Sequence, residues 1–277
     1  MKGKIYLVAT PIGNLDDITL RALEILKTVD LIAAEDTRHT LGLLNHFKIK
    51  KPLISYYKEI EKNKADILVE KALEGKNIAV VSDAGTPGIS DPGEEIVKLA
   101  IENNVEIVPI PGACAFVNAL ISSGFSTKEF IFIGFLSSIK KDKKEKLEEI
   151  KYEKRTLIFY EAPHKLINTL ETILEILGNR NIVLARELTK IHEEFIRGNI
   201  EEILSKIEEP KGEYVILVEG GVESKKEKEL SDLNELSLEK HYEFYENQGL
   251  EKKEIIKKIA KDRNINKNEI YQYFLNK

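Results

Sequence analysis

The sequence predicts an α/β fold with two α/β domains, and three observations support this prediction. Short apolar runs rich in β-branched residues recur along the chain, which is typical of parallel strands buried on both faces. Amphipathic helical patterns separate the runs, and such alternation indicates a parallel sheet covered by helices. Loops of small residues follow the first runs, and the 277-residue length allows two medium domains with an appendage.

The bulk composition limits the class of protein. Apolar residues make up 42% of the chain, but no stretch is long enough to span a bilayer, so we expect a soluble cytoplasmic protein with no membrane partner. The apolar run near the N-terminus is too short for a signal peptide. The single cysteine, Cys114, excludes an intramolecular disulfide, and the five histidines form no ligand-spaced pair, so no metal is expected. A net charge of −5 gives no general affinity for nucleic acid.

The first domain is predicted over residues 1–120. Its strands are expected at four short apolar runs, which lie at residues 5–9, 31–34, 78–81 and 106–110. Leucine and isoleucine recur at helical spacing after the first run and before the third. Because the carboxyl ends of parallel strands meet at one edge of a sheet, the loops after these runs should form a single binding site.

The loop at residues 81–93, VSDAGTPGISDPG, is the most informative of the four. A connection from a strand to a helix usually needs only a few residues, whereas this one is long and poor in bulky side chains. Its glycines, Gly85, Gly88 and Gly93, permit positive φ angles and let the backbone approach a ligand closely. An elaborate turn without a ligand is the alternative, and the three other small-residue loops weigh against it.

The second domain is predicted over residues 121–222. Its strands are expected at residues 130–135, 156–160, 182–186, 194–197 and 214–219. A helical pattern over residues 165–177 ends at Gly178, a residue that commonly stops helices. Some of these strands follow each other with no helix between them, so we expect a mixed sheet.

Two charged segments stand apart from the domains. Residues 138–155 are dense in lysine, which predicts either a solvated helix or an arm that contacts phosphates. Residues 223–237 are typical of a linker, and residues 238–277 carry three short helical patterns. Two of these patterns, joined by a polar turn at 264–268, outline a helix-turn-helix module. Such a pair of helices binds nucleic acid or docks on protein, and the pattern leaves both readings open.

The absence of common motifs narrows the ligand. The chain has no GxxxxGK[ST] phosphate loop, no GxGxxG after the first strand and no GxSxG nucleophile elbow. Small-residue loops without a phosphate motif suit a nucleoside that carries a non-phosphate tail. S-adenosylmethionine fits that description, although the pattern alone does not name it.

Six strings carry a resemblance to a known family. They are VATPIGNLDDITLRAL (8–23), AEDTRHTLGLLNHFKI (34–49), VSDAGTPGISDPG (81–93), PIPGACA (109–115), FYEAPHKL (159–166) and ARELTKIHEE (185–194). They resemble the ribosomal RNA small subunit methyltransferase I group, which are 16S rRNA (cytidine-2′-O)-methyltransferases of the tetrapyrrole methylase superfamily. The first loop reads TPIGN and the third SDAGTP, departures from the porphyrinoid enzymes that put a porphyrinoid substrate in doubt.

The resemblance implies a fold, a cofactor and partners. We expect two α/β domains of the tetrapyrrole methylase (class III) type, S-adenosyl-L-methionine in the cleft between them, and a small C-terminal helical extension. The expected partners are 16S rRNA in the small ribosomal subunit and a second copy of the chain. The cofactor contacts of the superfamily map to twelve positions in this sequence: Pro11, Ile12, Asp83, Ala84, Gly85, Gly88, Cys114, Ala115, Tyr160, Glu161, Leu188 and Gly212.

Methyl transfer to a ribose 2′-hydroxyl needs a base that takes the hydroxyl proton. Four carboxylates in the expected cleft loops qualify: Asp36, Asp91, Glu161 and Glu187. We predict Glu187 or Asp36 as the base, with Arg38 and Arg186 as groups that position the substrate's phosphates. Two other functions stay open, a small-molecule methyltransferase of the same superfamily and a non-enzymatic, nucleotide-responsive regulator whose tail binds DNA.

Overall fold

The computed structural model describes residues 1–222 and 224–275. Residues Met1–Glu148 and Arg155–Glu219 form one compact unit, here called the α/β unit. Residues Glu149–Lys154 and Gly220–Lys277 form a second one, here called the tail unit. No helix in the described parts of the chain is long and apolar enough to cross a membrane.

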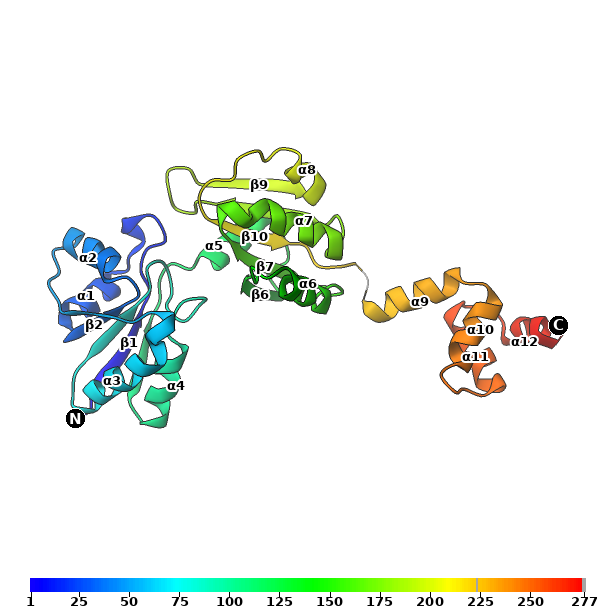
Figure 1. Cartoon of the computed structure of the whole chain (residues 1–277), viewed down its shortest axis with the longest axis horizontal. Helices are drawn as coiled ribbons and strands as arrows, with labels where there is room; N and C mark the ends of the chain where they lie inside the picture. The colour runs from blue at the N-terminus through cyan, green and yellow to red at the C-terminus, as the bar shows by residue number, and fades with distance from the viewer. Residues whose placement is uncertain (223, 276–277) are drawn as a thin grey trace. The chain divides into compact units, whose positions relative to one another are not determined.

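The first sheet is fully parallel (Figure 1). Its strands run in the order β3-β2-β4-β1-β5, and each pairs in parallel with its neighbours. Their bounds are β1 (Lys4–Val8), β2 (Leu31–Ala34), β3 (Leu53–Ser55), β4 (Ile78–Val81) and β5 (Glu106–Ile110). The central β4 is buried at all four positions, as expected for a strand covered on both faces. The sequence prediction missed only β3 in this sheet.

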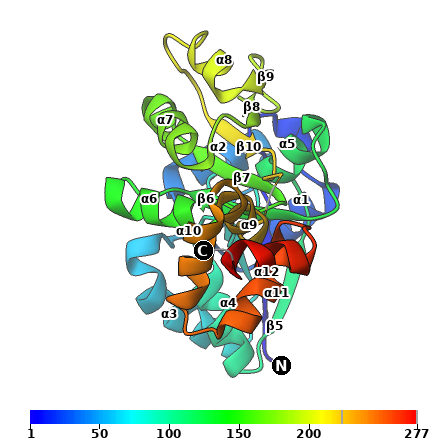
Figure 2. The same cartoon turned by 90° about the vertical axis from the view of Figure 1, so that its right-hand side faces the viewer.

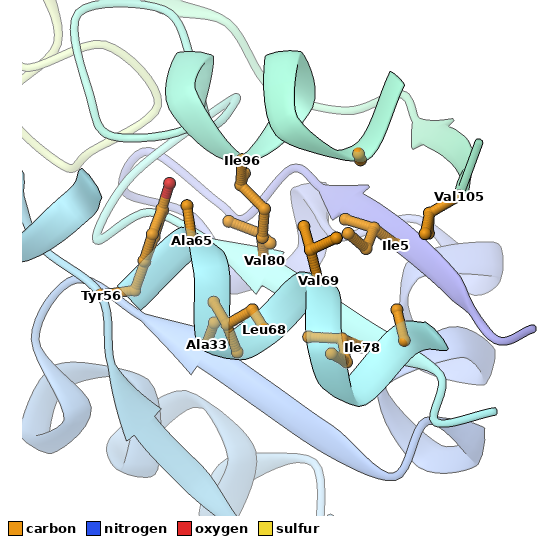
Figure 3. Close-up of a cluster of buried hydrophobic side chains, with 12 residues drawn as sticks. Ile5, Ala33, Tyr56, Ala65, Leu68, Val69, Ile78, Val80, Ile96 and Val105 are labelled. Carbon is orange, nitrogen blue, oxygen red and sulfur yellow. The ribbon is translucent and has the colours of Figure 1, made fainter. Parts of the chain in front are cut away.

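Helices cover both faces of the first sheet. On one face, α1 (Leu20–Thr28) and α2 (Thr37–His46) contribute Leu26 and Leu44 to a buried cluster. On the other, α3 (Glu61–Leu73) and α4 (Glu94–Glu102) pack Leu68 and Ile96 against the strands, as Figure 3 shows. Short 3-10 helices, η1 (Leu15–Asp17) and η2 (Lys58–Ile60), complete the connections.

The second sheet is mixed, which confirms the prediction. Its order is β6-β7-β10-β8-β9, and only β6 and β7 pair in parallel. The bounds are β6 (Phe130–Phe135), β7 (Thr156–Glu161), β8 (Asn181–Arg186), β9 (Glu194–Asn199) and β10 (Tyr214–Val218). Because β10 runs antiparallel to β7 and β8, its start lies beside their ends, so three chain segments meet at one edge.

Four α-helices accompany the second sheet. They are α5 (Ala115–Ser123), α6 (Lys140–Glu149), α7 (Leu166–Leu177) and α8 (Ile200–Leu204), with the 3-10 helix η3 (Pro163–Lys165) before α7. Helix α5 packs Ala119 and Leu120 against Ile158 and Val215 of this sheet. It therefore packs on the second sheet, although the sequence-based division places it largely within residues 1–120.

The tail unit is helical. Helix α9 (Lys225–Glu235) occupies much of the segment predicted as a linker, and Ser224 and Glu227 form a capping box at its start. A capping box supplies the first amides of a helix with partners, which explains why this polar segment is helical. Residue 223 lies outside the described residues. Helices α10 (Leu238–Glu246), α11 (Lys252–Asp262) and α12 (Lys267–Leu275) match the three predicted helical patterns.

Candidate active site

A cavity of about 530 Å³ lies in the α/β unit, lined by loops from both sheets. The first sheet contributes the segments that follow β1, β2, β4 and β5, all at the carboxyl edge of the sheet. The second sheet contributes the ends of β7 and β8 and the start of β10. The volume is that of a site for a small molecule or cofactor.

Two first-sheet loops are tied together at the cavity. The Thr10 amide donates to the Gly85 carbonyl at 2.8 Å, and the Gly85 amide donates to the Thr10 carbonyl at 3.1 Å. Gly85 has φ +85°, and a β-carbon there would lie 3.2 Å from the Cγ2 atom of Ile12. A side chain at this position would therefore be strained and crowded, so glycine keeps this part of the wall open.

Three carboxylates give the wall a negative charge. Glu35, Asp83 and Asp91 all line the cavity. The Asp36 amide donates to Asp83 Oδ1 at 2.9 Å, which fixes one of the three. Burial, with the charges of Glu35 and Asp83, raises the pKa of Asp91 to about 7. Burial, and after it the charge of Asp83, raises the pKa of Glu35. A ligand with positive charge relieves the repulsion among these carboxylates, so the cavity favours such a ligand.

Aromatic and sulfur groups form the apolar part of the wall. The rings of Tyr160 and Phe135 meet edge to face, with centroids 5.5 Å apart, and both line the cavity with Cys114. The Phe116 amide donates to the Tyr160 hydroxyl oxygen at 3.2 Å. Burial raises the pKa of both Tyr160 and Cys114, so neither group is ionised near neutral pH. The Tyr160 hydroxyl is therefore a donor rather than a base.

A buried chain of hydrogen bonds supports Glu161 from behind. Thr169 Oγ1 donates to Glu161 Oε2 at 2.6 Å, and Lys143 Nζ donates to Thr169 Oγ1 at 2.9 Å. Lys143 Nζ also donates to Asn168 Oδ1 at 3.1 Å, while the Ala162 amide donates to Glu161 Oε1 at 2.9 Å. Lys143 and Glu161 are each only 4% exposed. These hydrogen bonds thus fix the Glu161 carboxylate at the cavity wall, and Thr169 links it to the buried ammonium group of Lys143.

The loop after β8 holds Glu187 in a network of its own. Lys190 Nζ donates to Glu187 Oε1 at 2.9 Å, and the Glu213 amide donates to the same oxygen at 3.0 Å. The hydrogen bond from Lys190 is the largest cause that lowers the pKa of Glu187, and the bond from the Glu213 amide lowers it further. A β-carbon on Gly212 would lie 2.4 Å from Glu187 Cγ, so glycine at 212 permits this close packing. The carboxylate of Glu187 is therefore a weak proton acceptor.

The structure brings ten of the sequence-predicted site residues together around the cavity. Six lie on loops of the first sheet or at the start of α5: Ile12, Asp83, Ala84, Gly85, Cys114 and Ala115. Four belong to the second sheet and its loops: Tyr160, Glu161, Glu187 and Leu188. Pro11, Gly88 and Gly212 do not line the cavity themselves, and each is close in sequence to a residue that does.

Three of the four predicted catalytic residues lie outside the cavity lining. Asp36 caps α2 and accepts from Arg38 Nε at 3.1 Å and Arg38 Nη2 at 2.7 Å. Hydrogen bonds from Arg38 lower the pKa of Asp36 to about 2. Arg186 donates to the Lys211 carbonyl at 2.8 Å and to Glu194 at 3.1 Å. Only Glu187 of the four lines the cavity.

Several cavity residues were not among the sequence-predicted site residues. One is Glu35, whose signal was present as an acid in the small-residue loop after β2. Asp91, one of the four carboxylates that qualified as the base, lies within the predicted loop 81–93 and also lines the cavity. Phe135 and His164 also line the cavity. Phe135 follows Gly134, where the β6–β7 register shifts, and a bulge of this kind turns a side chain in a way that an alternating pattern does not show.

Comparison with known proteins identifies the family. The family model of Tetrapyrrole (Corrin/Porphyrin) Methylases matches residues 4–204. The chain belongs to this methylase family. A relative from Halalkalibacterium halodurans named "Ribosomal RNA small subunit methyltransferase I" is 50% identical over 99% of this chain and 95% of its own length. A relative of the same name from Thermotoga maritima is 46% identical over 79% of this chain and 99% of its own length. The family resemblance predicted from the sequence is confirmed.

Solved structures of the methylase family share the fold. The methyltransferase CobJ gives a TM-score of 0.59 at 18% identity and covers 79% of this chain and 95% of its own. The uroporphyrin-III C-methyltransferase of Thermus thermophilus, in complex with S-adenyl homocysteine, gives 0.56 at 17% identity and covers 78% and 97%. The predicted α/β fold of the tetrapyrrole methylase type is thereby confirmed.

Proposed function

We propose that this chain is an S-adenosylmethionine-dependent methyltransferase that methylates the ribose 2′-hydroxyl of a cytidine in 16S rRNA. The observation that carries the proposal is the full-length similarity to relatives named for ribosomal RNA of the small subunit, combined with a cavity formed by the loops that the sequence motifs mark. The porphyrinoid enzymes share the fold at no more than 22% identity, so they support only the fold.

The cavity suits S-adenosylmethionine by its chemistry. Its sulfonium and ammonium groups are positive, and Glu35, Asp83 and Asp91 provide the complementary charge. Ile12 and Leu188 supply apolar surface for the flat adenine ring, and Gly85 leaves the backbone accessible beside them. Glu161, with its buried Thr169 support, provides a fixed acceptor. A family member of the same fold binds S-adenyl homocysteine, the product of methyl transfer from this cofactor.

The chain's own residues supply orientation and proton removal. When bound, the cofactor supplies a methyl group attached to a positively charged sulfur. The cavity walls would hold the acceptor hydroxyl beside the bound cofactor, which replaces a bimolecular encounter. The Asp91 carboxylate, which lines the cavity, would take the hydroxyl proton as the oxygen accepts the methyl group. Glu187 and Asp36, the bases preferred from sequence, are each held by a cation that lowers their pKa.

The finer parts of the proposal concern the substrate and the assembly. A folded RNA site offers more than one contact surface, so we propose the assembled small ribosomal subunit as the substrate. We also propose a homodimer, following the family resemblance, and sedimentation of the purified chain tests it. A species of monomeric mass at working concentration contradicts the dimer.

The test uses purified protein, cofactor with a labelled methyl group, and small ribosomal subunits that lack the modification. The RNA is then digested to nucleosides and separated. Label in 2′-O-methylcytidine supports the proposal. Cofactor binding with no labelled nucleoside favours the small-molecule methyltransferase, and no cofactor binding contradicts the assignment of the cavity.

The regulator with a DNA-binding tail is a weaker candidate. It predicts that Lys257, Lys258 and Arg263 contact duplex DNA. Arg263, however, donates to His241 Nδ1 at 3.2 Å and to the Leu233 carbonyl at 3.2 Å within the tail unit. Arg263, one of the three residues expected to contact DNA, thus binds other residues of the tail unit.

A further inference from the structure

The tail unit has a core of its own, which fixes what its helices expose. Ile255, Ile256 and Ile259 of α11 are each at most 1% exposed and pack with Tyr245 of α10 and Ile270 of α12. Figures 1 and 2 show α10, α11 and α12 side by side. Because isoleucines hold one side of α11 in the core, the opposite side of that helix faces solvent.

The outer side of α11 is a row of lysines. Lys253, Lys257 and Lys261 are spaced four residues apart, so they follow one line along the helix at intervals of about 6 Å. All five lysines of α11 are exposed: Lys252, Lys253, Lys257, Lys258 and Lys261. This helix has only two acidic residues, Glu254 and Asp262.

These lysines are not neutralised by the fold. Among residues 1–222 and 224–275, none of the five forms an ion pair. Other lysines of the same unit do: Lys154 pairs with Glu227 at 2.7 Å and Lys228 with Asp232 at 2.9 Å. Lys258 lies over the Tyr245 ring at 4.7 Å, which leaves its charge in place. The positive charge of α11 is thus available to a partner.

Helix α12 packs against α11 and carries a different chemistry on its own outer side. Ile270 and Phe274 pack into the core, so Asn268, Tyr271 and Gln272 form the outer side of the helix. All three are exposed. Amide groups pair with base edges and tyrosine rings stack on unpaired bases, the two ways in which proteins read RNA outside a duplex.

We propose that the lysine row of α11 (Lys253, Lys257 and Lys261), with the α12 face (Asn268, Tyr271 and Gln272), is a docking surface for the RNA substrate. This inference rests on the proposed function and adds a second binding surface to it. Charge complementarity with phosphates supports RNA, because the chain as a whole carries −5 and this row is a local exception. An acidic protein partner would use the lysines but has no need of the amide and aromatic face.

The docking surface should affect binding of RNA and not the chemistry. The relative from Thermotoga maritima aligns over 79% of this chain and 99% of its own length, so it has no counterpart for about a fifth of this chain. The cavity lies wholly in the α/β unit. We therefore expect the tail unit to lower the KM for RNA and to leave the KM for the cofactor unchanged.

The test is the full-length variant Lys253→Glu/Lys257→Glu/Lys261→Glu. Exposed Lys-to-Glu changes preserve helix propensity, and circular dichroism checks that helix content is kept. We expect affinity for protein-free 16S RNA to fall by at least about tenfold at physiological salt. The slope of log K against the logarithm of the salt concentration should become less steep by about three, one for each lysine. The KM for the cofactor and the kcat at saturating RNA should stay unchanged.

A matched control carries the same charge change elsewhere. Lys27→Glu/Lys48→Glu/Lys50→Glu alters three exposed lysines of the α/β unit. An equal loss in this control, or no loss in the tail variant, overturns the proposal. A loss seen with assembled subunits but not with protein-free RNA also overturns it, and assigns the tail to a ribosomal protein.

A second variant separates the two parts of the surface. Tyr271→Ala/Gln272→Ala should weaken RNA binding about fivefold or more by loss of stacking, with no change in the salt slope. No change in affinity removes α12 from the docking surface. Because these are direct binding measurements, they decide the docking proposal even if the wild-type chain methylates no RNA, which is the separate failure of the proposed function.

Discussion

Helices α6 and α11 each contain five lysines, yet the fold uses them in opposite ways. In α6, Lys143 is buried against Thr169 and Asn168, Lys144 pairs with Glu175, and Lys141 lies 3.8 Å from Glu145. In α11 all five lysines are exposed, and none forms an ion pair with a described residue. Lysine content alone therefore does not predict a surface for nucleic acid.

The difference follows from the apolar positions of each helix. Helix α6 has one apolar residue, Leu147, and Lys143 lies one turn before it on the same side. That side is buried, so Lys143 enters the core and needs polar partners there. Helix α11 has a complete apolar stripe, so no lysine is drawn inward. Lys143 and Lys144 are therefore not available as phosphate contacts, which weakens the alternative of a phosphate-contacting arm in residues 138–155.

The largest effect should come from Asp91, the half-buried carboxylate at the cavity. Asp91→Asn keeps the shape of the side chain and removes its ability to take a proton. We expect kcat to fall by about 100-fold or more, since a positioned base contributes this much. Cofactor affinity should fall less. Single-turnover methyl transfer measures the effect on kcat. The free energy of unfolding should stay the same or rise above pH 7, because the variant removes the Asp91 charge that the fold disfavours.

The kcat of Asp91→Asn is to be compared with the kcat of Asp36→Asn and of Glu187→Gln. Asparagine still caps a helix, so Asp36→Asn keeps the start of α2 while it releases Arg38. If either variant loses as much kcat as Asp91→Asn, the base is not Asp91, and the residue preferred from sequence takes its place.

The pH dependence follows from the same carboxylate. Burial, Glu35 and Asp83 raise the pKa of Asp91 to about 7 in the free protein. A base acts in its ionised form, so kcat/KM for the cofactor should rise with pH and level off above about 7. A bound cation favours the carboxylate, so the midpoint for kcat should lie at lower pH. A flat kcat/KM profile between pH 5 and 8, with protein folded throughout, contradicts this expectation.

The next effect tests the inward lysine of α6. Lys143→Met keeps the length of the side chain but leaves Thr169 and Asn168 without their donor. The free energy of unfolding of the α/β unit should fall by about 2 kcal/mol, the cost of an unsatisfied buried group. Chemical denaturation with amide exchange in α7 measures it. The KM for the cofactor should also rise, because Glu161 loses its support.

Lys141→Met is the matched control on the same helix. Its side chain is 81% exposed and its partner Glu145 is also exposed, so the change should cost less than about 0.5 kcal/mol. A double-mutant cycle with Thr169→Val then tests the chain of hydrogen bonds. Additive losses would show that Lys143 and Thr169 act independently.

The sequence predicts the strands well because hydrophobic runs follow burial directly. Nine of the ten strands appear where apolar runs predict them, and the exception, β3, has only three residues, all half-buried. The cavity loops were also predicted, since small residues after strands mark the carboxyl edge of a sheet. These features depend on local composition and on the parallel arrangement of strands.

Side-chain partners were harder to predict because they depend on contacts between distant residues. Asp36 follows β2 as a cleft residue would, but it caps α2 and binds Arg38 instead. The pKa of Asp91 depends on Glu35, which is 56 positions earlier in the chain. The burial of Lys143 depends on Thr169, on the next helix. No pattern within a short window contains these pairs.

The smallest effect should come from the outward lysines of α6, and it sharpens the comparison most directly. Lys140→Glu/Lys141→Glu changes two exposed residues and leaves Lys143 and Lys144 in their contacts. If pairing decides which lysines serve RNA, affinity for 16S RNA should change by less than about twofold, because Lys141 lies 3.8 Å from Glu145 and Asp142 follows directly on the same helix. The same binding assay and salt series used for α11 apply. A loss equal to that of the α11 variant would mean that both helices contact RNA, and that lysine density rather than pairing is the better guide.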